Sequence, residues 1–300
     1  MRILIIGGTR FVGLAIAREC LKRGHELTLF HRSDSVPRGT EAATHVRGDR
    51  ESDLDLISDQ DWDVVIDVCA YRPHQVSELA SAINSETVKY VLISTVSVYS
   101  EEIPANGTET ALLASLQVLE NQDLKTMDIT GETYGPLKVK CEQVAKDLFA
   151  NLLVIRPTYV IGPDDYTNRF TSWVDRVLQQ DIVKLPTPLE VPLQYIDVRD
   201  LAQFTVNQIE HDICDIFHVA SPSGGDSFGR VITEIAKATG RQNVEFVSLS
   251  ESESLNRASE FPLWAQSDEA PMLQMDTAKA LKAGLEVRPL SQTIIDITNE

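Results

Sequence analysis

Cysteine is scarce in this sequence, and the few cysteines present are scattered. The chain of 300 residues has four, with no Cys-x-x-Cys spacing among them: Cys20, Cys69, Cys141 and Cys214. This pattern matches neither a disulfide framework nor a zinc site, and it is typical of a reducing compartment. We therefore expect no metal centre.

Long hydrophobic runs are also missing. The N-terminal apolar run at residues 3–6 is too short for a signal peptide, and no later run is long enough to span a membrane. The sequence therefore predicts a cytoplasmic protein without a membrane partner.

Positive charge is in deficit. The chain has 27 Lys and Arg against 45 Asp and Glu, which gives a formal net charge of -18, and its basic residues form no cluster. Because nucleic-acid binding needs local positive charge, we expect no nucleic-acid partner. The hydrophobic content of 43% is ordinary for a globular protein, and this length suits one large or two interlocked domains.

Short apolar runs alternate with helical patterns through the first half of the chain. Strands are expected at residues 2–6, 26–30, 63–68, 88–94 and 152–157. Helices are expected at residues 11–23, 74–83 and 133–150. Strands separated by helices form a parallel sheet, so the pattern predicts a Rossmann-type, doubly wound α/β fold.

The alternation of strand and helix patterns becomes irregular after Pro157, because further prolines interrupt it. Two later strands are expected at 191–198 and 215–220, and a helix at 228–238. We assign residues 1–160 to a dinucleotide-binding domain, with later returns of the chain near 191–220. Residues 161–300 are expected to form mainly a smaller substrate-binding lobe.

The stretch ILIIGGTRFVG, residues 3–13, has a strand, a glycine turn and a helix start. Gly7 can adopt a backbone conformation closed to other residues, and Gly13 allows close packing of helix and strand. The N–H groups at the helix start suit a pyrophosphate. The predicted contacts in this turn are Gly7, Thr9, Arg10, Phe11, Val12 and Gly13.

Two arginines bear on which cofactor binds. Arg10 stands in the turn, and Arg32 follows the strand at 26–30, where NAD-selective folds usually carry a carboxylate. Arginine forms forked hydrogen bonds to phosphate, so the pair favours the 2′-phosphate of NADP(H), with NAD(H) possible. In the alternative, Arg10 points to solvent and Arg32 pairs with Glu26 or Asp34.

Tyr134 and Lys138 are four residues apart and share one face of the helix at 133–150. Pro136 is expected in its first turn, where a missing N–H costs little. A lysine beside a phenol is expected to lower the pKa of the tyrosine, which could then exchange a proton with substrate during hydride transfer. In the alternative, the pair lies on a solvated helix face.

The strand at 88–94 supplies a third candidate group. Ser94 and Thr95 stand at its carboxyl end, where a hydroxyl could steady the substrate oxygen. The opposing interpretation is that small polar residues simply suit the end of a strand.

Together these residues resemble the extended short-chain dehydrogenase/reductase superfamily, in its NAD-dependent epimerase/dehydratase branch. The motifs that carry the resemblance are GGTRFVG, STVSVYS, YGPLK, VIRPTYVIGPDD and YIDVRDLA. The likeness is closest to an atypical subgroup with a GGTRF-type turn, which includes isoflavone-reductase-like proteins and relatives of chloroplast stem-loop-binding proteins.

The resemblance implies roles for single residues. Tyr134 is then the general acid/base, Lys138 holds the nicotinamide ribose, and Thr95 is the active-site hydroxyl. Beyond the glycine turn, Tyr134 and Lys138, the residues expected to line the cofactor are His31, Arg32, Asp49, Arg50, Cys69, Ala70, Tyr71, Ser94, Pro157, Thr158 and Tyr159. The family also implies a homodimer that uses the helix of Tyr134.

One departure from the family pattern narrows the reaction. Sugar-nucleotide dehydratases of this branch carry an Asp-Glu pair after the active threonine, where this chain has Val96 and Ser97. A dehydratase is therefore disfavoured. Residues 101–131 contain extra polar sequence, which we interpret as a flap over the substrate.

The leading functional interpretation is an NAD(P)-dependent reductase or epimerase acting on a small carbonyl or hydroxyl compound or a sugar nucleotide. The alternative is a dinucleotide-binding protein without catalysis, either a redox sensor or an RNA-binding relative. The intact Tyr134–Lys138 pair argues against a sensor, and the net charge of -18 argues against RNA.

Overall fold

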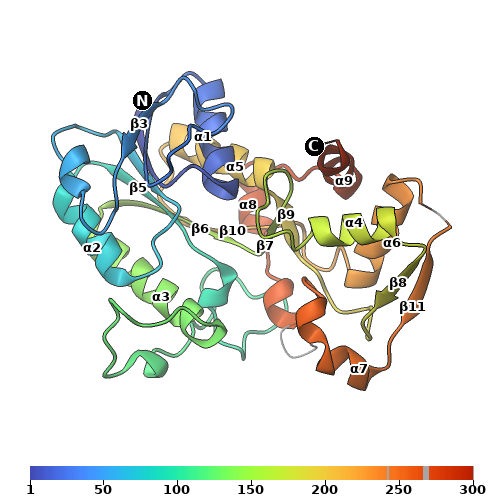
Figure 1. Cartoon of the computed structure of the whole chain (residues 1–300). Coiled ribbons are helices and arrows are strands. Elements are labelled where there is room, and N and C mark those ends of the chain that lie inside the picture. Colours follow the sequence, from blue (N-terminus) through green and yellow to red (C-terminus); the bar gives the residue numbers. More distant parts are fainter. Residues whose placement is uncertain (242, 266–269, 300) are drawn as a thin grey trace.

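A seven-stranded sheet organises the first domain of this computed structural model, which describes residues 1–241, 243–265 and 270–299 (Figure 1). The strand order is β10-β6-β5-β4-β1-β2-β3, and every pairing in the sheet is parallel. Its strands are β1 (Arg2–Ile6), β2 (Glu26–His31), β3 (Thr44–Arg47), β4 (Val64–Asp67), β5 (Lys89–Ile93), β6 (Asn151–Pro157) and β10 (Ile216–Val219). The predicted Rossmann-type fold is confirmed.

Helices cover both faces of this sheet. α1 (Phe11–Lys22) packs against α5 (Val198–Glu210) on one face, and α2 (Pro73–Ala82) packs against α3 (Gly131–Leu148) on the other (Figure 1). The central strands are aliphatic and buried, as a sheet covered on both sides requires. The strand order reverses between β1 and β4, and folds of this type bind ligands at the carboxyl ends of strands beside such a point.

The second lobe lies beside one end of the sheet, on the right in Figure 1. Its strands form two small parallel pairs: β7 (Tyr159–Ile161) with β9 (Tyr195–Asp197), and β8 (Ile182–Leu185) with β11 (Glu245–Ser248). The later helices are α4 (Thr171–Gln179), α6 (Phe228–Ala238), α7 (Glu251–Asn256), α8 (Ala278–Lys282) and α9 (Leu290–Thr298). Trp173, Phe228 and Phe261 pack together at the centre of the lobe core.

Five short 3-10 helices complete the described structure: η1 (Leu54–Ile57), η2 (Val96–Val98), η3 (Gln117–Leu119), η4 (Ala258–Glu260) and η5 (Ala270–Leu273). None of the helices in the described part of the chain has the length and apolar character needed to cross a membrane.

Two of the elements whose boundaries differ from those expected show a clear local cause. The strand expected at 191–198 is only three residues long, because Pro192 cannot donate to a ladder and α5 already begins at Val198. α3 begins at Gly131, two residues early, because Thr130 and Thr133 cap it reciprocally. Pro136 therefore lies in the second turn of α3, and its expected place in the first turn is wrong.

Candidate active site

The glycine turn follows β1 and needs all three of its glycines. Gly7 and Gly8 have φ angles of +99° and +82°, a region closed to most side chains. A Cβ on Gly13 would stand 2.8 Å from the Cα of Gly8. The absence of side chains at these positions lets α1 begin directly against the end of β1.

The start of α1 fits a diphosphate. Arg10 is the N-cap residue, its side chain makes no capping hydrogen bond, and the first turn contains no acidic residue. The N–H groups of that turn and the positive end of the helix dipole therefore face the turn without a competing carboxylate. Phe11 adopts a φ of +37°, a strained conformation of the kind found at ligand sites.

Arg32 lies at the tip of β2, where the adenosine of a dinucleotide would lie. Its side chain is 78% exposed and forms an ion pair with Asp49, with 3.3 Å between Nη1 and Oδ2. The alternative, in which Arg32 pairs with Glu26 or Asp34, is wrong. Arg32 forms its ion pair with Asp49, and Asp34 forms one with Arg47.

His31 and Arg50 turn inward at the same edge. His31 is 7% exposed, accepts a hydrogen bond from Ser33 N–H and contacts His45 at 2.8 Å. Arg50 forms a two-pronged ion pair with Asp67, with both distances 2.9 Å. These contacts hold β2, β3 and β4 together, and a cofactor contact for either side chain stays a prediction.

The loop after β4 runs between the glycine turn and α3. The Cys69 sulfur would lie 3.4 Å from a Cβ on Gly7, so this loop packs directly on the turn. The Ala70 carbonyl accepts a hydrogen bond from Lys138 Nζ at 2.9 Å, and the Tyr71 ring centre lies 5.9 Å from the same nitrogen. All three predicted loop residues thus lie between the turn and the lysine.

The three predicted catalytic residues come together at the carboxyl end of β5. Thr95 caps η2 by accepting a hydrogen bond from Ser97 N–H at 3.1 Å, and its hydroxyl also lowers the pKa of the Tyr134 phenol on α3. Lys138 is 3% exposed, and its Nζ donates to Ala70 O and, at 2.7 Å, to Ile93 O. An ammonium has three N–H groups, so one remains for a ligand hydroxyl.

Gly135 is a site residue that the sequence analysis missed. A Cβ at this position would overlap the carbonyl oxygen of Ser97. The glycine therefore lets α3 touch η2, which brings Tyr134 to Thr95. The motif YGPLK contained the signal, because a glycine inside a helix usually marks a close approach.

Burial, rather than Lys138, dominates the ionisation of Tyr134. Burial raises the pKa of the phenol, and the Thr95 hydroxyl and the positive charge of Arg169 partly oppose the rise. The expectation that Lys138 lowers this pKa is wrong, because the ammonium points to the carbonyls of Ala70 and Ile93. Burial also lowers the pKa of Lys138.

The Ser94 side chain belongs to a buried polar network. Its hydroxyl donates to Glu142 at 2.5 Å, and Glu142 forms a two-pronged ion pair with Arg156. Pro157 is buried at the end of β6, and the Thr158 Oγ1 is buried without a hydrogen-bond partner among the described residues. Cofactor contacts for Ser94, Pro157 and Thr158 stay predictions.

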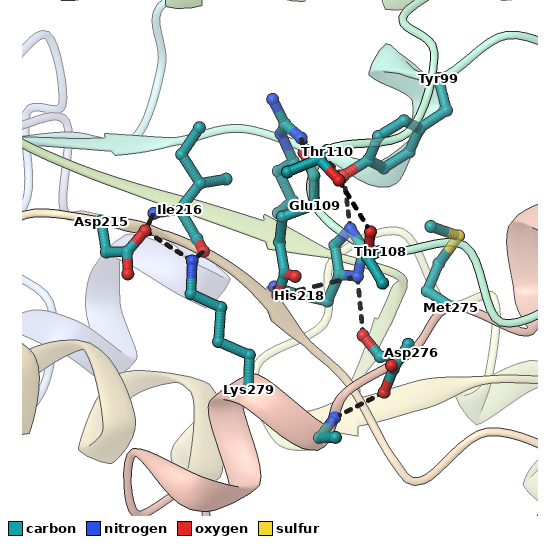
Figure 2. Close-up of polar contacts among 12 residues, drawn as sticks. Tyr99, Thr108, Glu109, Thr110, Asp215, Ile216, His218, Met275, Asp276 and Lys279 are labelled. Atoms are coloured by element: carbon teal, nitrogen blue, oxygen red, sulfur yellow. Dashed lines mark hydrogen bonds and ion pairs between the residues drawn. The ribbon is translucent and has the colours of Figure 1, made fainter.

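The network continues to His218 on β10 (Figure 2). Arg156 donates to the Tyr99 hydroxyl oxygen at 2.5 Å, and Tyr99 and His218 Nε2 are also 2.5 Å apart. His218 Nδ1 lies 2.8 Å from the Asp276 carbonyl, which only accepts, so Nδ1 carries the proton and Nε2 accepts from Tyr99. Burial lowers the pKa of His218, which agrees with a neutral ring.

One group has the composition of a metal site. Ligand atoms of Glu51, His74 and Glu78 lie within 4.8 Å of one another. His74 contacts Glu51 at 2.9 Å, and Lys125 forms an ion pair with Glu78 at 2.8 Å. Each of these side chains thus has a protein partner, and we assign no metal to them.

Fold and site together define a dinucleotide-fold protein of the extended short-chain dehydrogenase/reductase superfamily, with a Thr-Tyr-Lys group beside a glycine turn. The chain belongs to the NAD dependent epimerase/dehydratase family, whose model matches residues 3–220. The resemblance drawn from the motifs is thereby confirmed.

The chain is similar to the chloroplast stem-loop binding protein of 41 kDa b from Arabidopsis thaliana, with 27% identity over 271 residues. This match covers 82% of the chain and 65% of the relative, so the chain spans about two thirds of the relative's length. The relative fits the subgroup with the GGTRF-type turn.

Solved structures share the fold over the whole chain. UDP-glucuronic acid 4-epimerase from Bacillus cereus, determined with NAD, has a TM-score of 0.71 at 18% identity and covers 100% of this chain and 99% of its own. A dTDP-4-dehydrorhamnose reductase from Clostridium acetobutylicum has a TM-score of 0.70 at 18% identity, with 100% of both chains covered. Such identities establish the shared fold.

Proposed function

We propose that the protein is an NAD(P)-dependent reductase or epimerase that uses Tyr134 as its general acid/base. The observation that carries the proposal is the meeting of Thr95, Tyr134 and Lys138 at the sheet edge that also holds the open start of α1. A nicotinamide cofactor bound there would supply or accept the hydride.

Each side chain then has one task. Tyr134 exchanges a proton with the substrate oxygen, and its raised pKa keeps the phenol protonated and ready to donate near neutral pH. The Thr95 hydroxyl lowers the pKa of the same phenol and would steady the reacting oxygen of the substrate. Lys138 uses its remaining N–H to hold a ribose hydroxyl, since two backbone carbonyls already fix its ammonium.

Water elimination is disfavoured as the reaction. After Thr95, η2 has Val96, which is 6% exposed, and Ser97 in the places where a dehydratase would need a carboxylic acid and a carboxylate. Neither side chain can act as an acid/base in an elimination.

The function is tested with Tyr134→Phe. The variant keeps the ring and loses the proton donor, so we expect unchanged NADPH affinity and a fall in turnover of about a hundredfold or more. Binding is measured by NADPH fluorescence, and turnover is measured on a panel of carbonyl compounds and sugar nucleotides. Net NADPH consumption indicates a reductase, whereas an epimerase returns its hydride. Full activity of the variant would refute the role of Tyr134.

We propose NADP(H) as the preferred cofactor, with Arg32 and Arg10 at the 2′-phosphate. Arg32 is exposed and has only a 3.3 Å contact with Asp49, so a phosphate can take its place beside the guanidinium. Arg32→Ala should weaken NADPH binding about tenfold or more and leave NADH binding nearly unchanged. Arg47→Ala, which removes a neighbouring exposed arginine paired with Asp34, is the control. Equal losses for NADPH and NADH would contradict the assignment.

Similarity to a stem-loop binding protein makes RNA binding the second candidate function. The net charge of -18 disfavours it, because phosphate contacts need positive charge and weaken as salt rises. Filter binding with a stem-loop RNA at low and at moderate salt decides the matter. Salt-sensitive retention of the RNA would support this candidate.

A further inference from the structure

His31 and His45 contact each other across two neighbouring strands and join two parts of one loop. His31 ends β2, His45 lies on β3, and the loop at 32–43 connects these strands. His31 Nε2 is 2.8 Å from His45 Nδ1. His31 Nδ1 accepts the backbone N–H of Ser33 at 3.2 Å, and His45 Nε2 is 3.0 Å from the Thr40 carbonyl oxygen. A continuous chain of hydrogen bonds therefore runs from the start of the loop, through both rings, to the later part of the loop.

The backbone groups at the two ends of this chain fix where its protons lie. A backbone N–H only donates, so His31 Nδ1 presents a lone pair to Ser33 and the ring carries its proton on Nε2. A carbonyl oxygen only accepts, so His45 carries its proton on Nε2 and accepts from His31 at Nδ1. Every N–H group thus meets an acceptor, and both rings are neutral.

The chain has no place for a further proton. The nitrogens that could take one are His31 Nδ1 and His45 Nδ1, and each already accepts an N–H group. A proton on either nitrogen removes an acceptor and turns two N–H groups toward each other, so a hydrogen bond must break. Burial and the neighbouring His45 lower the pKa of His31, which agrees with a ring that resists protonation. His45 is only half-buried, so protons from solvent can reach the pair.

The carboxylates around the pair have other partners. Between residues 32 and 50 the charged side chains are Arg32, Asp34, Arg38, Glu41, Arg47, Asp49 and Arg50. Asp34 pairs with Arg47, and Asp49 pairs with Arg32. Glu41 accepts the Gly39 N–H at 2.9 Å, and this contact lowers the pKa of Glu41, so its charge does not change where histidine titrates. Within the described ranges of the chain, no carboxylate contacts either imidazole ring.

The loop that the pair holds carries Arg32, the proposed contact for the 2′-phosphate of the cofactor. On the other side of β2, β1 is aliphatic from Ile3 to Ile6 and offers the rings no charge. From α1, Arg18 donates to the Arg38 carbonyl at 3.0 and 2.8 Å and so anchors the middle of the loop. Loss of the contact to His31 would leave the Ser33 N–H without its acceptor, and Ser33 follows Arg32 directly. A break in the chain would therefore act on the adenosine end of the proposed cofactor site.

We propose that His31 and His45 form an acid-sensitive latch, in which uptake of one proton frees the loop at 32–43 and weakens the binding of NADP(H). The inference rests on the proposed function for its cofactor, whereas the latch itself is measurable without one. A free imidazole takes up its proton near about pH 6.5, and the closed latch takes it up only at lower pH. The latch is therefore fully closed above about pH 6.5 and is progressively lost as the pH falls below that value.

The latch is tested by hydrogen–deuterium exchange of the full chain without cofactor, at about pH 7.5 and about pH 5.5, with rates corrected for the intrinsic effect of pH. In the wild type, peptides covering 32–43 should exchange about fivefold faster at the lower pH, because one hydrogen bond is lost. In His31→Gln/His45→Gln the amides can still donate and accept along the chain but do not titrate, so the acid effect should vanish. His45→Gln alone, which keeps one titrating ring, should reduce it.

His211→Gln is the matched control. His211 is exposed at the end of α5, where its Nδ1 lies 2.8 Å from the Asn207 carbonyl oxygen, and its loss should leave the acid response of the loop unchanged. Equal corrected exchange of the wild-type loop at both pH values overturns the inference. An acid response of the same size in the wild type and in both glutamine variants overturns it as well.

NADPH affinity is then measured at the same two pH values and expressed as the ratio between wild type and His31→Gln/His45→Gln, so that protonation of the cofactor's own phosphate cancels. The wild type should lose about fivefold more affinity in acid than the variant. A gain of affinity in the wild type relative to the variant would mean that the added charge attracts the phosphate, and it would overturn the inference. Failure of the wild type to bind NADPH at either pH contradicts the proposed function instead, and the exchange measurement still decides whether the latch exists.

Discussion

Gly135 shows how much of the site depends on a missing side chain. The backbone of α3 runs against the Ser97 carbonyl, and only a residue without a Cβ fits there. This contact sets the position of Tyr134 relative to Thr95. A methyl group at 135 must push either α3 or η2 away, which separates the two hydroxyls.

Gly135→Ala is therefore expected to lower turnover at least about tenfold and to destabilise the protein by about 1–3 kcal/mol. Turnover and urea unfolding measure the two effects. Gly131→Ala is the control, because the first residue of α3 has open space around its Cα. Similar activities in the two variants would contradict the role given to Gly135.

Residue types explain which site residues could be predicted. Tyr134 and Lys138 could be predicted because a four-residue spacing places two side chains on one helix face. Gly135 was harder to predict, because its role depends on a contact with η2, a segment distant in sequence. Ser94 was predicted as a cofactor contact because it follows β5, but its hydroxyl donates a hydrogen bond to Glu142 on α3.

Residues 101–130 form an anchored element between η2 and α3. Leu113 bridges to Tyr99, and Gly107 O accepts a hydrogen bond from Asp276 N–H at 3.0 Å. Ile103 is 3% exposed in a small core that includes Met275. The start of the predicted flap is thus fixed to the rest of the protein, and its role over the substrate stays a prediction.

Glu109 ties this element to β6 and β10 (Figure 2). Its side-chain carboxylate accepts a hydrogen bond from the backbone N–H of His218 at 3.1 Å. Its backbone carbonyl accepts one from Arg156 Nη1 at 3.0 Å. Glu109→Ala leaves the buried backbone N–H of His218 without an acceptor and should lower the free energy of unfolding by about 1–3 kcal/mol.

Urea unfolding measures this cost, with Glu109→Gln as the conservative comparison. The amide oxygen of glutamine can still accept from His218 N–H, so this variant should stay close to wild type. If alanine and glutamine are equally destabilising, the charge of Glu109 matters more than its hydrogen bond.

The segment at 162–170 joins the two lobes across the glycine turn. Asp164 forms an ion pair with Arg18 of α1, and the Tyr166 ring centre lies 5.6 Å from the Arg10 guanidinium. It therefore contacts α1 and the N-cap residue of that helix beside the glycine turn.

At the scale of the whole molecule, buried tyrosines link stability to pH. Tyr90, Tyr99 and Tyr195 are 0%, 2% and 7% exposed. Burial raises the pKa of Tyr99 to about 12 and also raises the pKa of Tyr90 and Tyr195. In the unfolded chain these phenols ionise near about pH 10.

Above about pH 10 the unfolded state therefore holds fewer protons than the folded state, and the stability that these phenols contribute is lost as the pH rises. We expect the melting temperature to be level below about pH 9 and to fall steeply above about pH 10. Phenolate absorbance followed during melting should rise together with unfolding. Ionisation of all tyrosines in a protein that stays folded would contradict this.

The sequence by itself determined the periodicity of the elements, and with it the fold, the glycine turn and the Tyr134–Lys138 face, because local spacing decides which side chains share a strand or helix. Tertiary structure alone decided the inward turn of Ser94, His31 and Arg50, and the close approach of Gly135 to Ser97. Those outcomes depend on contacts between distant segments, where burial and the pairing of charges choose among orientations that the local sequence leaves equally open.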